Sequence, residues 1–156
     1  MNDKVMPHNL EAEQSALGSM FLSKYALQKC MESLTSDMFY SDANGKIFSA
    51  ICSLYENGQA IDITTVTAEL DQKKLLKAVG DVEYLTEVIS VVPTAANVDE
   101  YIKIVEEKSI LRRLIEEGTS IVTSGYQSTD SLSEILDSAE KKILSVVKTR
   151  KGSEFK

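Results

Sequence analysis

The chain has 156 residues and a formal net charge of −7, with 43% hydrophobic and 26% charged residues. This length and composition are typical of one globular domain with a buried core and exclude a disordered chain. Few glycines and prolines argue against a β sandwich or barrel, and the acidic balance argues against a general nucleic-acid binder, which needs lysine and arginine to neutralise phosphates.

Helical periodicity dominates the first part of the chain. Asn9 can cap a first helix, and a short second helix is expected over 25–31. One face of the first helix is predicted to be apolar and to carry Leu10, Ala16, Leu17, Met20 and Phe21. The segment 35–40 is expected to be a loop that anchors aromatic residues in the core. A helix over 43–56 follows, with Ile47, Ile51, Leu54 and Tyr55 on one side, and Asn57-Gly58 should end it as a C-terminal cap.

The segment 60–70 carries conflicting signals. Its β-branched residues favour a strand, whereas Asp62 is a good cap for a helix that begins at Ile63. No second strand is available for pairing, so a helix is the better prediction and a strand is the alternative. Two further short helices, over 73–79 and 82–91, are expected on either side of Gly80. Pro93 then marks the end of a compact head.

After Pro93 the pattern predicts an antiparallel helical hairpin. A long helix is expected over 97–124, a turn over 124–130 near Gly125 and Tyr126, and a return helix over 131–148. The fold class is therefore all-α, with a multi-helix head over 1–93 and a hairpin over 94–150. The last segment, 151–156, is expected to begin a linker.

The two hairpin helices differ in their apolar faces. The return helix has a single stripe formed by Leu132, Ile135, Leu136, Ala139, Ile143, Val146 and Val147. The outgoing helix has one face for the head, formed by Val98, Tyr101, Ile102 and Val105, and a second arc formed by Ile110, Leu111, Leu114, Ile115, Ile121 and Val122. A hairpin alone cannot cover this arc, and large exposed apolar patches mark interaction sites. We therefore expect dimerisation through Leu111, Leu114, Gly118 and Val122, where the glycine lets another backbone approach.

The positions of the charged residues on the hairpin are typical of solvated helix surfaces and helix ends. The pairs Lys103/Glu107, Arg112/Glu116 and Arg113/Glu117 stand four apart and are expected to form a solvated helix face. Basic residues gather within the last sixteen positions, where cations suit the end of a helix. A DNA contact at this end is the less favoured alternative.

No pattern for catalysis or cofactor binding is present. There is no GxxxxGK[ST] phosphate loop and no GxGxxG, and His8 is the only histidine, which excludes a multi-histidine metal site. Cys30 and Cys52 form no CxxC pair and are expected to be reduced packing residues. No apolar run is long enough to span a membrane, and residues 1–9 do not resemble a signal peptide, so a cytoplasmic protein is expected.

Two long motifs stand out in the sequence. They are PHNLEAEQSALGSMFL over 7–22 and VVPTAANVDEYIKIVEEKSILRRLI over 91–115, and shorter segments such as DMFY, KIFSAI and TVTAEL lie in order between them. Together these motifs resemble the N-terminal domain of DnaB-type hexameric replicative helicases. The resemblance covers nearly the whole chain. It departs from the family at His8, where glutamine is common, and at Asp81, where a second glycine is common.

The resemblance implies a function in assembly and docking. Such domains pair through their hairpins, and three dimers form a collar that docks the C-terminal domain of primase; a helicase loader is a further candidate partner. ATP and Mg²⁺ would belong to a separate RecA-like motor domain, so this part of the chain is expected to hold no cofactor and to be no enzyme by itself. Little direct DNA binding and no membrane contact are expected.

The primase-docking surface is expected to include Glu11, Tyr84, Ile115 and Ile121. Glu11 falls outside the apolar stripe of its helix, and tyrosine is enriched at interface hot spots. The alternative is that Tyr84 and both isoleucines are plain core residues. For the whole chain, a free-standing helical adaptor without a motor is the competing hypothesis. The way the basic C-terminus ends, without a cap, favours a fragment of a longer protein.

Overall fold

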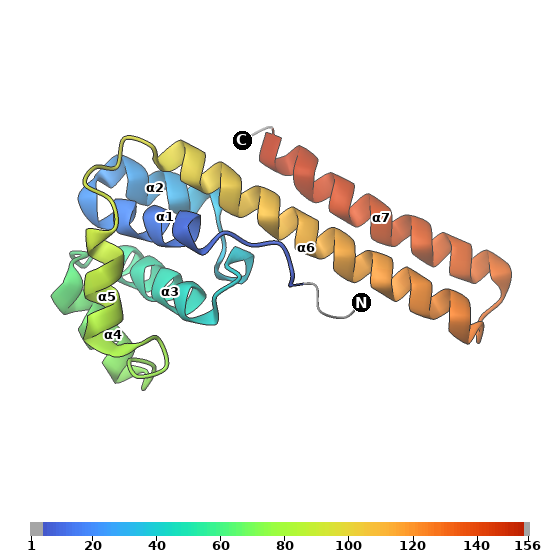
Figure 1. The fold of residues 1–156 in the computed structure, drawn as a ribbon, viewed down its shortest axis with the longest axis horizontal. Coiled ribbons are helices and arrows are strands. Elements are labelled where there is room, and N and C mark those ends of the chain that lie inside the picture. Colours follow the sequence, from blue (N-terminus) through green and yellow to red (C-terminus); the bar gives the residue numbers. More distant parts are fainter. Residues whose placement is uncertain (1–4, 155–156) are drawn as a thin grey trace. The chain divides into compact units, whose positions relative to one another are not determined.

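The computed structural model describes residues 5–154, and these residues form helices and no strand (Figure 1). The all-α prediction is therefore confirmed. The elements are α1 (Leu10–Leu22), α2 (Lys24–Ser33), the 3-10 helix η1 (Ser36–Met38), α3 (Asp42–Glu56), α4 (Ile63–Gln72), α5 (Asp81–Ser90), α6 (Val98–Gln127) and α7 (Leu132–Glu154).

Side-chain caps decide where several helices begin. Asn9 Oδ1 accepts a hydrogen bond from the backbone N–H of Ala12 at 2.9 Å, as the sequence predicted. Asp62 Oδ1 accepts from Thr65 N at 2.9 Å, and Thr65 Oγ1 accepts from Asp62 N at 3.0 Å. These reciprocal bonds satisfy N–H groups that a helix start otherwise leaves unpaired. Capping thus outweighs β-propensity here, and the predicted helix over this segment is confirmed.

The helix predicted over 73–79 is absent, and this segment is a series of turns. Lys74 has a φ of 61° in the left-handed region, so α4 cannot continue through it. Leu75 N donates to Leu70 O at 2.8 Å and closes the end of α4 instead. Asp81 also has a positive φ, of 65°, at the position where the family commonly has glycine. Its Oδ1 accepts from Val82 N at 2.8 Å, a local bond that helps aspartate to tolerate this conformation.

The hairpin reverses later than the sequence indicated. Gly125 and Tyr126 remain helical, and the turn lies beyond Gln127, where Ser128 has a φ of 48°. The extra turn of α6 forms because Ser128 N still donates to Ser124 O, at 3.0 Å. Ser131 caps α7 through a 3.2 Å bond from Glu134 N. The return helix runs to Glu154, past the predicted end at Lys148.

By its internal packing the chain divides into two units. One comprises His8–Glu106, and the other comprises 1–7 together with Glu107–Lys156. The division falls inside α6 rather than at Pro93, and the domain boundaries at 93 and 150 stay predictions. Residues 1–4 of the predicted head and 155–156 of the predicted linker lie outside the described residues.

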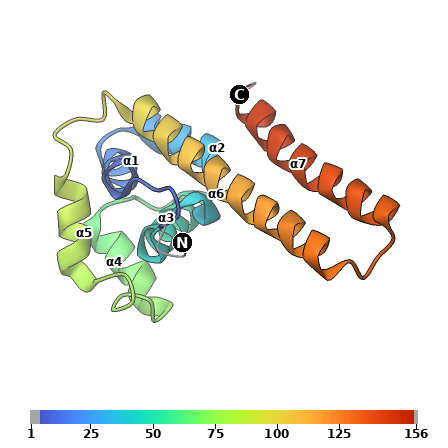
Figure 2. The ribbon, with the colours of Figure 1, turned by 45° about the vertical axis from the view of Figure 1, so that its right-hand side comes forward.

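The unit His8–Glu106 has a continuous apolar core. Helix α1 packs on α2, α3 and α5, and α4 packs on α3 and α5 (Figures 1 and 2). The first turns of α6 contribute Val98, Ile102 and Val105, so the face predicted for the head is buried there. The residues with the largest fully buried side chains include Leu17, Ile47, Ile51, Leu70, Leu85 and Val88.

One predicted core position is wrong, because Tyr40 is 41% exposed. Leu10 and Tyr55, which belong to the apolar faces predicted for two helices, are also exposed, at 42% and 37%. In the aromatic segment 35–40 only Phe39 is buried, whereas the ring of Tyr40 stacks on His8 with centroids 4.1 Å apart. The cysteines do pack as expected for thiols: burial raises the pKa of Cys30 to about 12 and that of Cys52 to about 11.

Gly18 marks a close approach between α1 and α5. A Cβ atom at this position would lie 2.5 Å from the carbonyl oxygen of Val88, which belongs to the backbone and cannot rotate away. Gly18→Ala gains about 1 kcal/mol of helix propensity but forces the two helices apart. We expect a net loss of about 1–2 kcal/mol in the free energy of unfolding, measured by urea denaturation.

Gly125→Ala is the matched control, since a Cβ there meets none of the described residues within 4 Å. The same propensity gain should leave this variant as stable as the wild type or slightly more stable. An increase in stability for Gly18→Ala of the same size as for Gly125→Ala would contradict the close-approach interpretation.

Candidate partner-binding site

A buried carboxylate organises the head. Glu13 on α1 is only 2% exposed. Its Oε2 accepts from Tyr40 N at 2.7 Å, and its Oε1 accepts from Ser41 N at 3.2 Å and from Asn44 Nδ2 at 3.0 Å. These donors lie in the loop before α3 and in its first turn, where the helix dipole favours a negative charge. Glu13 therefore ties the start of α3 to α1.

The same network continues to the surface through Tyr84 on α5. Asn44 is fully buried, and its Oδ1 accepts from the Tyr84 hydroxyl at 2.6 Å. The hydroxyl in turn accepts from Gln14 Nε2 at 3.1 Å. Burial raises the pKa of Tyr84, and the hydrogen bond from Gln14 partly opposes this rise. The phenol is thus held as a neutral donor between α1, α3 and α5.

Sequence reasoning missed Glu13 and Asn44. The available signal was positional: Glu13 stands three and four residues before Ala16 and Leu17, which belong to the apolar stripe of α1. A carboxylate on a stripe that faces the core must find donors there. Its donors come from residues 27 to 31 positions away, and no local pattern predicts them.

The predicted docking residues fall in two places. Glu11 is exposed on α1, as expected, one turn before Gln14. Tyr84 is partly buried and bonded to Gln14, so these residues share a region of the head. Ile115 and Ile121 belong to the other unit, on the second half of α6, where Ile115 is 42% exposed and Ile121 is partly buried. The first pair is brought together within one unit.

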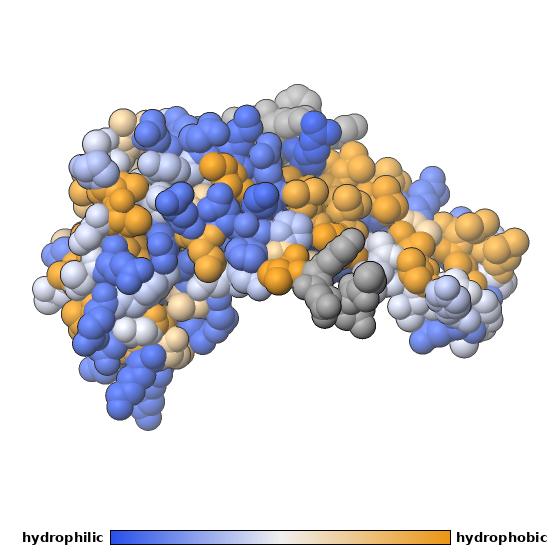
Figure 3. All heavy atoms as spheres, in the orientation of Figure 1, coloured by the Kyte–Doolittle hydropathy of each residue, from blue (hydrophilic) through white to orange (hydrophobic). Residues whose placement is uncertain are grey.

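The residues predicted for self-association lie on an uncovered part of α6. Leu111, Leu114 and Val122 are 42%, 43% and 57% exposed, and a Cβ at Gly118 would meet no atom within 4 Å in the described part of the chain. Helix α7 adds exposed apolar residues at Leu132, Leu136, Ile143 and Val147. We call these seven apolar side chains and Gly118 the apolar hairpin surface, and hydrophobic residues are visible along the hairpin (Figure 3).

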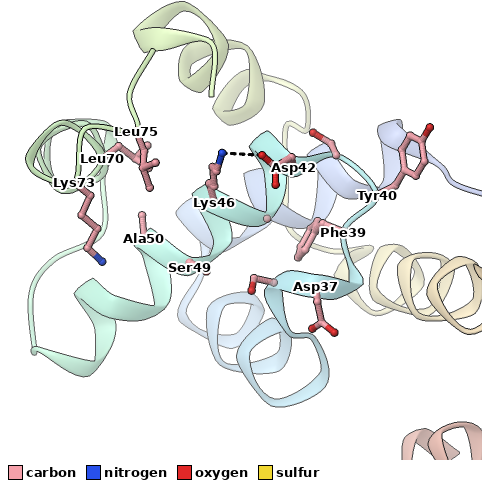
Figure 4. Close-up of a pocket in the computed structure, with 13 residues that line it drawn as sticks. Asp37, Phe39, Tyr40, Asp42, Lys46, Ser49, Ala50, Leu70, Lys73 and Leu75 are labelled. Atoms are coloured by element: carbon pink, nitrogen blue, oxygen red, sulfur yellow. Dashed lines mark ion pairs between the residues drawn. The ribbon is translucent and has the colours of Figure 1, made fainter. Parts of the chain in front are cut away.

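The head also contains a pocket of about 380 Å³ next to α3 (Figure 4). Its apolar lining includes Phe39, Ala50, Leu70 and Leu75. The ammonium group of Lys46 is paired with Asp42 at 2.7 Å at the edge of the pocket.

No three histidine, cysteine or carboxylate side chains in the described part of the chain are grouped so that they could hold a metal ion. None of the helices within residues 5–154 combines the length and the apolar character that crossing a membrane requires.

Comparison with known proteins shows that the chain is similar to one part of replicative helicases. The family model described as the DnaB-like helicase N-terminal domain matches residues 5–107. The chain is 45% identical over 155 residues to the replicative DNA helicase DnaC of Bacillus subtilis, and 43% identical over 151 residues to the replicative DNA helicase DnaB of Mycobacterium leprae. These matches span 99% and 96% of the chain but only 34% and 25% of the length of the two helicases.

Solved structures agree with the sequence comparison. The N-terminal domain of DnaB helicase from Mycobacterium tuberculosis matches with a TM-score of 0.85 and 44% identity, covering 91% of this chain and 99% of that one. A structure described as a DnaB-like replicative helicase and its interactions with primase matches with a TM-score of 0.72 over 90% of this chain and 31% of that one. At 21% identity, the second likeness indicates a common fold.

Proposed function

The chain belongs to the family of DnaB-like helicase N-terminal domains, and from this premise we propose that it forms the collar of a hexameric replicative helicase. In this role it pairs subunits and docks primase, while another part of the protein unwinds DNA. The observation that carries the proposal is the apolar hairpin surface. A lone domain gains nothing from exposing so many apolar side chains, whereas a second copy can bury them.

Pairing through this surface is supported by its composition. Leu111, Leu114 and Val122 provide apolar area, and Gly118 lies between them without a side chain. In a two-fold dimer the same patch meets itself, so each residue contributes twice. Three such dimers would complete a hexameric collar.

Gly118→Leu tests the pairing. The leucine introduces bulk where two backbones are proposed to approach, so we expect self-association to weaken by about tenfold or more. Helicity should be unchanged, because leucine favours a helix more than glycine does. Sedimentation over a range of concentrations measures the association, and circular dichroism measures the helicity.

Glu116→Leu is the matched control. It adds a leucine at an exposed position of α6 that lies about 160° round the helix from Gly118, at roughly 100° per residue. This variant should associate like the wild type. If the wild-type domain keeps the mass of a single chain at all concentrations, pairing through the isolated domain is wrong.

The docking of primase is the second part of the proposal. Glu11, on the exposed side of α1, and the ring of Tyr84 on α5 provide the candidate contacts of the head, and Ile115 and Ile121 provide those of α6. The partner we propose is the C-terminal domain of primase. A loader protein is a further candidate for the same collar.

The remaining features of the whole protein are proposals of the same kind. ATP and Mg²⁺ would bind a RecA-like motor domain outside this chain, and DNA would be held mainly there. The protein would act in the cytoplasm, at the replication fork. Purified domain without the motor should neither bind nor hydrolyse ATP, and turnover that survives repurification would contradict this division of labour.

A further inference from the structure

Polar contacts, rather than apolar ones alone, join the two helices of the hairpin. Arg113 on α6 donates through Nη1 to Thr149 Oγ1 on α7 at 2.7 Å, and its Nη2 lies 3.5 Å from Ser145 Oγ. Lys142 on α7 donates through Nζ to Ser120 Oγ on α6 at 2.6 Å. One cation from each helix therefore reaches a hydroxyl on the other. We call these five residues the polar seam.

The cations of the polar seam are partly buried and have no acidic partner. The sequence predicts that Arg113 lies with Glu117 on a solvated helix face, but neither Arg113 nor Lys142 has a carboxylate within 4.0 Å among the described side chains. A partly buried cation without a counter-ion costs free energy relative to an apolar residue of similar size. Such an arrangement calls for a function other than stability.

The hydroxyl groups are oriented to accept. Ser145 Oγ donates its own hydrogen to Lys142 O at 2.8 Å, and Thr149 Oγ1 donates to Ser145 O at 3.0 Å. Their lone pairs are thus left to face Arg113. Because both hydrogens are used within α7, these two side chains act towards Arg113 as acceptors.

The spacing of the seam places its residues along one line on the surface of each helix. Arg113 and Ser120 are seven positions apart on α6, and Lys142, Ser145 and Thr149 are separated by three and four positions on α7. Residues at these intervals lie on one side of a helix. In coiled coils a single polar residue on this line selects one register, because shifted pairings leave it without a partner.

The rotation selected by the seam decides which residues remain uncovered. On α7 the seam and the buried Val146 face α6, whereas Leu132, Leu136, Ile143 and Val147 stay exposed. An apolar contact line would instead attract these residues towards α6. The polar seam therefore opposes a rotation of α7 that would bury these exposed apolar residues against α6.

We propose that Arg113 and Lys142 are positioning residues that fix the rotation and register of α7 on α6, so that the apolar hairpin surface faces a second copy of the chain. This inference rests on the proposed pairing. The sequence predicts solvated positions for both cations. In the proposed role they keep the apolar hairpin surface available to the second copy.

The test combines an intrachain distance with self-association. Spin labels are placed at Thr123→Cys and Glu140→Cys, both exposed on their helices, in a Cys52→Ser background. The labelled protein is diluted into unlabelled protein. Pulsed electron paramagnetic resonance then measures the distance between the two labels of one hairpin. In the double variant Arg113→Met/Lys142→Met we expect the distance distribution to broaden or shift and self-association to weaken by about tenfold.

Two further variants sharpen the test. The exchange Arg113→Lys/Lys142→Arg keeps a donor at each position and should restore much of the wild-type distance and association. Lys141→Met, on the exposed side of α7, is the matched control and should change neither.

Each other outcome overturns the inference. An unchanged distance with weakened association means that the cations contact the second copy directly, and a changed distance with full association means that the rotation does not matter for pairing. Unchanged values for both exclude any positioning by the seam. If the wild type fails to associate, the proposed pairing fails, while the distance still reports whether the seam sets the rotation.

Discussion

Replacing Glu13 by alanine should lower the free energy of unfolding by about 3–5 kcal/mol. The carboxylate accepts three hydrogen bonds from donors in the loop before α3 and in its first turn. Alanine would leave the N–H groups of Tyr40 and Ser41 and the amide of Asn44 without their acceptor. A donor that loses its partner inside a protein costs about 1–3 kcal/mol, and the fully buried Asn44 cannot turn to solvent.

Chemical denaturation of the purified domain measures this loss. Glu11→Ala is the matched control, because Glu11 is an exposed glutamate two residues earlier on the same helix. The control should lose at most about 0.5 kcal/mol. Comparable stabilities for the two variants would mean that the Glu13 contacts contribute little beyond what water supplies to the same groups.

Removing the side chain of Tyr84 should have the largest effect on partner binding. If the ring is a hot spot, Tyr84→Ala costs about 2 kcal/mol in affinity for the C-terminal domain of primase, or about thirtyfold. The hydroxyl is occupied inside the head by Asn44 and Gln14, so it is the apolar ring that remains for a partner. Titration calorimetry measures the affinity.

Tyr84→Phe separates the ring from the hydroxyl. It removes the 2.6 Å bond to Asn44 and should cost about 1–2 kcal/mol of stability, while affinity for primase stays near that of the wild type. Thermal unfolding of both variants completes the comparison. Lost stability together with full affinity in Tyr84→Ala would show that the residue belongs to the core and that this docking site is wrong.

Local signals in the sequence were sufficient for most of the helices. Asn9 and Asp62 begin α1 and α4 because a side-chain oxygen close in sequence can satisfy the first N–H groups of a helix. The end of α3 at Asn57-Gly58 follows from the positive φ of 70° that glycine adopts at low cost. These interactions span only a few residues, so they can be recognised without knowledge of the fold.

The exact ends of several helices depend on contacts with the rest of the molecule. The sequence predicts a turn at Gly125, yet this residue is helical, since glycine permits a turn without requiring one. The segment 73–79 consists largely of residues that favour a helix. It is not helical, because α4 ends at Gln72 and the chain turns back towards α4 at Lys74. Propensity is a weak preference, and contacts with the rest of the molecule override it.

The sequence by itself determined the all-α class, the order of the helices and the apolar arc around Gly118, because periodicity and capping are properties of neighbouring residues. Only the tertiary structure decided the roles of the charged and polar groups. It placed Glu13 inside, beside Asn44 and Tyr84, and it directed Arg113 across the hairpin to Thr149 instead of along its own helix to Glu117. The physical reason is that a polar side chain takes its role from its partner, and these partners lie 31 to 40 positions away.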